Sequence, residues 1–176
     1  ALRYAPDGPA APLPLHLPGG LFERIGAVLT GHGARELAEA FDVRPLVAGE
    51  PFSVGGVRIT PVPVDHVEPT YALVAESGTA RLCYTSDTRT GPAVLAAARG
   101  ASVLLAEATL PPAFENRAPH MTPGQAADLA TEAGASTLVL THLWPTVDRA
   151  EAGRIARERF HGRVIVADEL TSIDVD

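Results

Sequence analysis

Five ionisable residues stand where their side chains could act together as a metal site or an acid–base site. His66, Asp87, Glu107 and His142 each come at or just after the end of a hydrophobic, strand-like run, and His120 lies just ahead of a helix start. Imidazole and carboxylate groups are ligands that suit Zn²⁺ and similar ions. Any one such residue is more often a turn or capping residue. Because the pattern recurs at four strand ends, as in layered α/β enzymes, we predict a metal site.

The elements that must position these residues alternate short β-like runs with amphipathic helices, which is typical of a layered α/β (α+β) protein. His32, between Gly31 and Gly33, is expected in a loop between helices. We expect one domain over residues 1–176. The expected strands or extended pieces are 13–17, 45–48, 52–54, 57–64, a hairpin of 71–76 and 81–85, then 102–106, 137–141, 163–167 and a last one at Ile173 and Val175. The expected helices are 20–30, 34–40, 92–99, 123–133 and 150–160.

The helix expected at 123–133 has clear start and stop signals. Thr122 is a suitable N-cap, Pro123 takes the first helical position, and Gln125 can complete a capping box. Gly134 stands where a helix commonly ends. His120 therefore lies just ahead of a capped helix.

Composition excludes several classes of protein. The formal net charge of −7 argues against a strong nucleic-acid surface, which needs clustered Lys and Arg. No apolar run approaches the roughly 20 residues that span a bilayer, and residues 1–20 hold Pro and charge where a signal peptide is apolar. The single cysteine, Cys83, lies in an apolar strand-like run, where we expect it buried, and has no internal disulfide partner. We expect a cytoplasmic protein with no membrane partner.

The ordered motifs resemble a known family. The runs Pro63-Val64-Asp65-His66-Val67-Glu68-Pro69, Ser86-Asp87-Thr88, Ala106-Glu107-Ala108-Thr109, His120-Met121-Thr122 and Leu140-Thr141-His142 are similar, in this order, to the later motifs of metallo-β-lactamase-fold proteins of the ribonuclease Z-like branch. The resemblance covers nearly the whole chain from about Val57. It implies a four-layer αββα sandwich, here without its first strands.

The resemblance also implies a role for each of the five residues. His66 resembles the ligand that completes the first metal site, Asp87 the carboxylate that bridges two metals, and His142 the last ligand, on the second metal. His120 resembles the histidine that protonates the leaving oxygen, and Glu107 the residue that positions it and favours its charged form. The implied cofactors are two divalent metal ions, Zn²⁺ first and Mn²⁺ as the alternative, which activate a bridging hydroxide and stabilise charge on a phosphate.

One departure from the family pattern concerns the first ligand motif. The family's His-x-His-x-Asp-His run is absent from the 176 residues, and neither His16 nor His32 has the needed neighbours. We therefore expect an N-terminally truncated chain in which each metal keeps two protein ligands, where a catalytic zinc site usually has three. Such a fragment is expected to bind metal weakly and to be inactive by itself.

Other departures concern the substrate. The stretch from His66 to Asp87 is too short for the long insertion with which many ribonuclease Z enzymes clasp tRNA. The run Leu143-Trp144-Pro145-Thr146 lacks the Arg that those enzymes have there, and Ala106 replaces the first His of their His-Glu-Ala-Thr motif. With the acidic charge, these differences favour a small phosphodiester, and so a small-molecule partner, over tRNA.

The sequence thus favours a metal-dependent hydrolase, a phosphodiesterase in the complete protein. Three alternatives stay open: a tRNA 3′-processing endoribonuclease, a lactone or thioester hydrolase, and a non-catalytic remnant of the fold that serves as a binding module. The missing first strands are expected to leave an open sheet edge or an exposed apolar face, which predicts a homodimer.

Overall fold

The structure is a computed structural model that describes residues 11–29, 31–67 and 69–176. The chain forms two compact units, which meet in sequence between Val47 and Ala48. Each unit is described by itself. The expectation of a single domain over residues 1–176 stays a prediction.

The first unit is a small pair of parallel strands joined by two helices. Strand β1 (Leu13–Pro18) pairs in parallel with β2 (Phe41–Leu46), and α1 (Leu21–Ala27) and α2 (Gly31–Ala40) lie between them in the chain. The predicted extended piece at 45–48 therefore begins earlier, because pairing with β1 sets the bounds of β2.

The prediction of a loop at His32 is wrong. His32 lies in the first turn of α2, where its Nε2 is 3.3 Å from Glu36 Oε1 one helical turn later. Such pairs four residues apart stabilise a helix by about 0.2–0.5 kcal/mol, which compensates for only part of the cost of the glycines at either side of His32.

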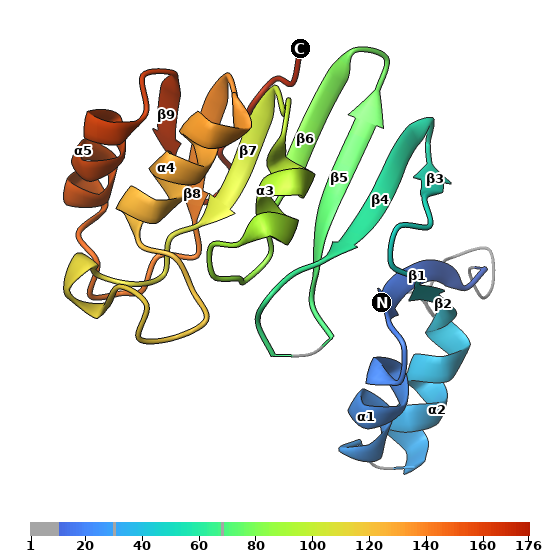
Figure 1. The fold of residues 1–176 in the computed structure, drawn as a ribbon. Coiled ribbons are helices and arrows are strands. Elements are labelled where there is room, and N and C mark those ends of the chain that lie inside the picture. Colours follow the sequence, from blue (N-terminus) through green and yellow to red (C-terminus); the bar gives the residue numbers. More distant parts are fainter. Residues whose placement is uncertain (1–10, 30, 68) are drawn as a thin grey trace. The chain divides into compact units, whose positions relative to one another are not determined.

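The second unit is built on one seven-stranded sheet (Figure 1). The strands follow chain order: β3 (Phe52–Val54), β4 (Val57–Pro63), β5 (Tyr71–Ser77), β6 (Ala80–Tyr84), β7 (Val103–Glu107), β8 (Thr137–Thr141) and β9 (Arg163–Val166). Neighbours are antiparallel from β3 to β6 and parallel from β6 to β9. The predicted hairpin is confirmed, and Gly78 supplies the left-handed φ of 60° that its tight turn requires.

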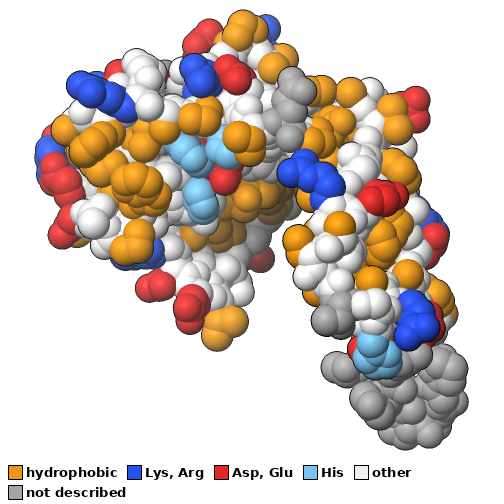
Figure 2. Space-filling model, turned by 90° about the horizontal axis from the view of Figure 1, so that it is seen from below, with side chains coloured by type: hydrophobic (Ala, Val, Ile, Leu, Met, Phe, Trp, Pro, Cys, Tyr) orange, Lys and Arg blue, Asp and Glu red, His pale blue; other side chains and the backbone are white. Residues whose placement is uncertain are grey.

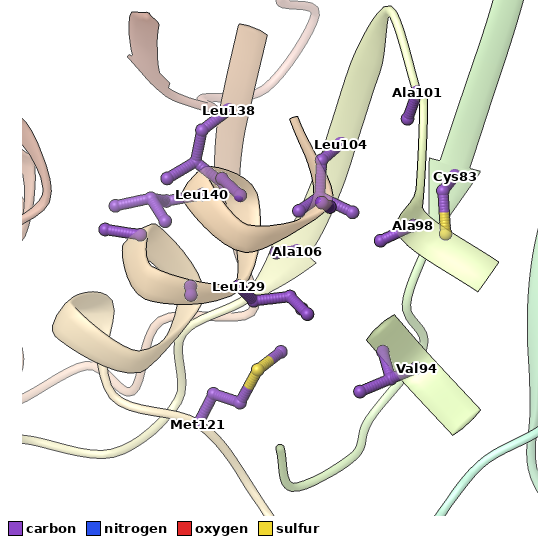
Figure 3. Packing of buried hydrophobic residues seen from close by; sticks show 14 of the residues in the cluster. Cys83, Val94, Ala98, Ala101, Leu104, Ala106, Met121, Leu129, Leu138 and Leu140 are labelled. Carbon is purple, nitrogen blue, oxygen red and sulfur yellow. The ribbon is translucent and has the colours of Figure 1, made fainter. Parts of the chain in front are cut away.

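Three helices cover one face of this sheet: α3 (Pro92–Ala98), α4 (Pro123–Ala133) and α5 (Arg149–Arg159) (Figure 1). Between the helices and the sheet lies the hydrophobic core, which holds Leu104, Leu138 and Leu140 from the strands and Val94 and Leu129 from the helices (Figure 3). Cys83 is fully buried in this core, as the sequence predicts. The cluster is rich in alanine, which lets α3 and α4 approach the strands closely.

The sheet face opposite the helices is also apolar. Because side chains alternate along a strand, Leu82 and Leu105 point away from the face that carries Cys83 and Leu104, and both are partly exposed. The predicted last strand at Ile173 and Val175 is wrong, since residues 171–176 form no regular element. Their alternation instead reflects packing, because Val175 lines a shallow apolar pocket together with Leu82.

The predicted capping of α4 is confirmed. The Thr122 hydroxyl accepts from the Gln125 backbone N–H, and the Gln125 side chain accepts from the Thr122 N–H, which completes a capping box. Gly134 ends the helix in the left-handed conformation. In the part of the chain that the structure describes, no helix is both long and apolar enough to cross a membrane.

Candidate metal and acid–base site

The topology of the sheet brings the predicted residues to one edge. Strands β6, β7 and β8 are mutually parallel, and β4 runs in the same direction because two antiparallel pairings separate it from β6. The carboxyl ends of all four strands therefore lie at one edge. His66 follows β4, Asp87 follows β6, Glu107 ends β7, and His142 follows β8.

Backbone contacts fix the loops that bear these residues. The Asp65 carbonyl accepts from the Arg89 N–H and from the Thr88 hydroxyl, at 3.1 and 3.2 Å, which joins the loop after β4 to the loop after β6. Ser86 and His142 have left-handed backbones, with φ of 52° and 54°. This conformation is uncommon for such residues, and backbone strain of this kind concentrates at functional sites.

The three histidines and Asp87 form one cluster. His66 Nε2 lies 3.2 Å from His120 Nε2, with ring centroids 4.7 Å apart, and the rings of His120 and His142 are 5.8 Å apart. Asp87 Oδ1 lies 3.5 Å from His142 Nδ1. Figure 2, which looks onto this edge of the sheet, shows histidine side chains gathered beside an acidic group on the surface. The structure therefore brings all the sequence-predicted ligands together, and His120 with them.

Glu107 lies beneath the cluster and is fully buried. Its Oε1 accepts from the Thr88 N–H at 2.9 Å and lies 2.8 Å from His120 Nδ1, while its Oε2 accepts from the Thr109 N–H at 3.1 Å. A buried carboxylate needs such donors, and both oxygens are engaged here. Because a carboxylate only accepts, His120 Nδ1 must bear a proton toward Glu107, which fixes the ring and directs Nε2 to the cluster.

Three threonines that the sequence analysis does not single out support these groups. Thr85 Oγ1 accepts from the Glu107 N–H at 3.1 Å, Thr88 donates its N–H to the Glu107 carboxylate, and Thr109 Oγ1 lies 2.6 Å from His142 Nδ1. All three are buried. Each lies within two residues of Asp87 or Glu107 in the chain, and this proximity is the sequence signal that could have identified them.

The donor set fits a divalent metal ion. His66, Asp87 and His120 each offer a ligand atom, all within 4.8 Å of one another, and so do Glu107, His120 and His142. The Nε2 atoms of His66 and His120 are 3.2 Å apart. Two nitrogen ligands of one tetrahedral zinc ion, with Zn–N bonds of about 2.05 Å, lie at a similar distance of about 3.3 Å from each other. Glu107 is a poorer donor, because both its oxygens already accept hydrogen bonds. The remaining imidazoles and the Asp87 carboxylate are the ligand types that zinc prefers.

The surroundings of the cluster are mixed in polarity. A pocket of about 400 Å³ adjoins His142 and is also lined by Arg149, Asp168 and Glu169. Burial raises the pKa of Tyr84, which ends β6, and the negative charge of Asp87 raises it further. The Tyr84 phenol therefore stays protonated near neutral pH. The acidic residues Asp168 and Glu169 border the site on the Arg149 side. Their negative charge limits the attraction of the site for polyanions.

The fold and the edge-of-sheet cluster define a class of protein, and comparison with known families agrees. Residues 13–143 match the beta-lactamase superfamily domain, a span that includes all five predicted site residues. The chain therefore belongs to the metallo-β-lactamase superfamily, whose members are metal-dependent hydrolases.

Particular relatives agree with this assignment. The chain is 32 % identical over 178 residues to protein ML1173 of Mycobacterium leprae, which covers 97 % of the chain and 62 % of that protein. It is also 36 % identical over 98 residues to ribonuclease Z of Methanothermobacter thermautotrophicus, which covers 54 % of the chain and 32 % of the enzyme. The chain thus spans less than two thirds of the length of these relatives.

Among solved structures, the fold is similar to that of the metallo-beta-lactamase fold protein YhfI from Bacillus subtilis. The TM-score is 0.76 at 23 % identity, over 88 % of this chain and 62 % of YhfI. At this identity the likeness concerns the fold. The predicted family and the mixed α/β fold class are confirmed.

Proposed function

We propose that the protein containing this chain is a metal-dependent phosphodiesterase that acts on a small phosphodiester. The observation that supports the proposal most directly is the cluster of His66, Asp87, His120 and His142 at one edge of the sheet, with the buried Glu107 behind it. The similarity to a ribonuclease Z, an enzyme that cleaves RNA, adds support for phosphodiester chemistry.

In this proposal His66, Asp87 and His142 would hold the metal. Divalent ions bound there would supply an activated nucleophile and would neutralise the negative charge that builds on the phosphate. Asp87 would serve both ions, since its carboxylate lies in the donor group of His66 and also beside the ring of His142. Zn²⁺ suits this mixture of nitrogen and oxygen donors, with Mn²⁺ as the alternative.

His120 and Glu107 are proposed to act as a proton donor and its positioning residue. Glu107 accepts from His120 Nδ1 at 2.8 Å, which orients the ring so that its Nε2 faces the cluster. The Nε2 proton then passes to the leaving oxygen as the phosphorus–oxygen bond breaks, which removes the need to expel a free alkoxide.

The first experiment tests the role of Asp87. The protein encoded by the complete reading frame and the 176-residue chain are assayed with bis-p-nitrophenyl phosphate in Zn²⁺ or Mn²⁺, alongside a measurement of bound metal. Asp87→Asn should lose both activity and metal in the active form, whereas Asp174→Asn, an exposed aspartate near the C-terminus, should retain them. Retained activity in the Asp87→Asn variant would contradict the proposal.

A second experiment separates proton donation from metal binding at His120. His120→Gln should keep bound metal and lose about 10²–10⁴-fold in rate on phosphodiesters with strongly basic alkoxide leaving groups. The loss should be much smaller with a p-nitrophenolate leaving group, which needs little protonation. Loss of metal instead would make His120 a ligand, and an unchanged rate on both substrates would contradict proton donation by His120.

tRNA 3′-processing is the second candidate, because named ribonuclease Z enzymes are among the relatives. The acidic net charge of −7 and the acidic groups beside His142 disfavour it. Cleavage of a precursor tRNA at rates above those for small diesters would favour this candidate. If the complete protein binds no metal and hydrolyses none of these substrates, the result would instead favour a non-catalytic binding module.

A further inference from the structure

Thr109 is a buried residue just beyond the end of β7, and it contacts both halves of the site. Only 1 % of it is exposed. Its backbone N–H donates to Glu107 Oε2 at 3.1 Å. Its hydroxyl oxygen lies 2.6 Å from His142 Nδ1 and 3.0 Å from the His142 carbonyl oxygen. Thr109 therefore links the residue proposed to orient the proton donor with a residue proposed to hold metal.

The protons available to these groups define the state of the His142 ring. The Thr109 hydroxyl has one proton to donate, and the His142 carbonyl can only accept. When the hydroxyl donates to the carbonyl, the contact at 2.6 Å requires His142 Nδ1 to be the donor. The Asp87 carboxylate agrees with this arrangement, because Oδ1 lies 3.5 Å from the same nitrogen and would repel a lone pair there.

We infer that Thr109 is a positioning residue that holds His142 in the Nδ1–H tautomer and leaves Nε2 as the nitrogen with the free lone pair. Metal-binding histidines commonly donate their other ring N–H to an oxygen, which fixes ring orientation and tautomer. The inference rests on the proposed function in taking His142 as a metal ligand. The tautomer itself does not depend on metal.

The first arm of the test therefore uses metal-free protein. Long-range ¹H–¹⁵N spectra of the 176-residue chain in a chelator, at a pH where the imidazoles are neutral, report which nitrogen bears the proton. The His142 signals are identified as those that His142→Gln removes. Wild type and Thr109→Ser, which retains the hydroxyl, should show the Nδ1–H form alone. Thr109→Val, which is nearly isosteric, should show a mixture of both forms.

The second arm measures Zn²⁺ affinity by competition with a chelator. Thr109→Val should weaken binding by about 10- to 100-fold, and Thr109→Ser should restore most of the loss. Thr79→Val, an exposed threonine in the β5–β6 turn, serves as the matched control and should bind like wild type. Circular dichroism checks that each variant is folded, and the wild-type spectrum decides the tautomer even if Thr109→Val does not fold.

Two results would overturn the inference. An Nε2–H form in wild type means that Thr109 donates to the ring. An unchanged Nδ1–H form in Thr109→Val means that Asp87 fixes the tautomer instead. If the chain binds no Zn²⁺ in either form, the proposed function fails for this chain while the tautomer result stands by itself.

Discussion

At the scale of single residues, the Glu107 carboxylate joins buried backbone groups to the His120 ring. Its two oxygens accept from two backbone N–H groups and face His120 Nδ1, in a position without solvent access. A glutamine at this position would replace one carboxylate oxygen with an NH₂ group, which cannot accept a hydrogen bond. At least one of the N–H groups of Thr88, Thr109 and His120 would then lose its acceptor. We predict that Glu107→Gln lowers the free energy of unfolding by about 1–3 kcal/mol, measured by urea denaturation in a chelator.

Glu132→Gln is the control for this change, because Glu132 is exposed on α4. Its effect should stay within about 0.5 kcal/mol. Equal stability of the two variants would mean that the hydrogen bonds to Glu107 contribute little.

Cys83 gives a second prediction at this scale. Burial in the core raises the pKa of its thiol from 9.0 to about 12. Between these values the unfolded chain loses the thiol proton while the folded chain retains it, so this group lowers stability as pH rises above about 9. We expect Ellman's reagent to label native protein very slowly at pH 8 and denatured protein at once. Because the sequence has one cysteine, the signal is unambiguous, and fast labelling of native protein would contradict the burial.

At the scale of elements, the start of α4 fixes the segment that bears His120. Thr122 follows His120 by two residues and caps the helix through the Gln125 N–H. Thr122→Ala removes this acceptor from a buried N–H, so we predict a loss of about 1–2 kcal/mol in unfolding free energy. Thr79→Ala, in an exposed turn, should change it by less than about 0.5 kcal/mol. The proposed phosphodiesterase rate should fall with Thr122→Ala, because the loop before the helix loses its anchor.

At the scale of the whole molecule, metal binding should appear as stability. Zn²⁺ at about 100 times its Kd should stabilise the folded chain by about 2.7 kcal/mol, which thermal unfolding detects. With two proposed protein donors for each ion, we expect this gain only at high metal concentration. Asp87→Asn should show no gain. A thermal shift at stoichiometric Zn²⁺ would instead indicate that His120 completes a three-donor site with His66 and Asp87.

The homodimer expected from the sequence also stays a prediction. The sheet of residues 48–176 ends at β3 and β9, and its face opposite the helices includes the partly exposed Leu82 and Leu105. Light scattering after size exclusion should give twice the mass of one chain. A monomer at high protein concentration would contradict the expectation.

Several features of the protein follow from the sequence alone. Alternating apolar runs and capping signals predict most of the elements of residues 48–176, because hydrophobic period and helix start chemistry are local properties. The five motifs predict the family and the five residues that the structure brings to one edge. Local pattern fails at two places. Ile173 and Val175 alternate because Val175 packs against the sheet, without strand pairing. His32 lies inside α2, which begins at Gly31 although glycines flank this histidine.

Only the tertiary structure decides how the site is supported. The contact of Thr109 with His142 joins residues 33 positions apart. The three N–H groups that surround the buried Glu107 carboxylate come together only where β6, β7 and the loop before α4 meet. A sequence pattern can indicate which groups reach the edge of a sheet. The distance and direction between those groups depend on the register of neighbouring strands and on loop backbones such as the left-handed Ser86 and His142, which arise from contacts distant in the chain.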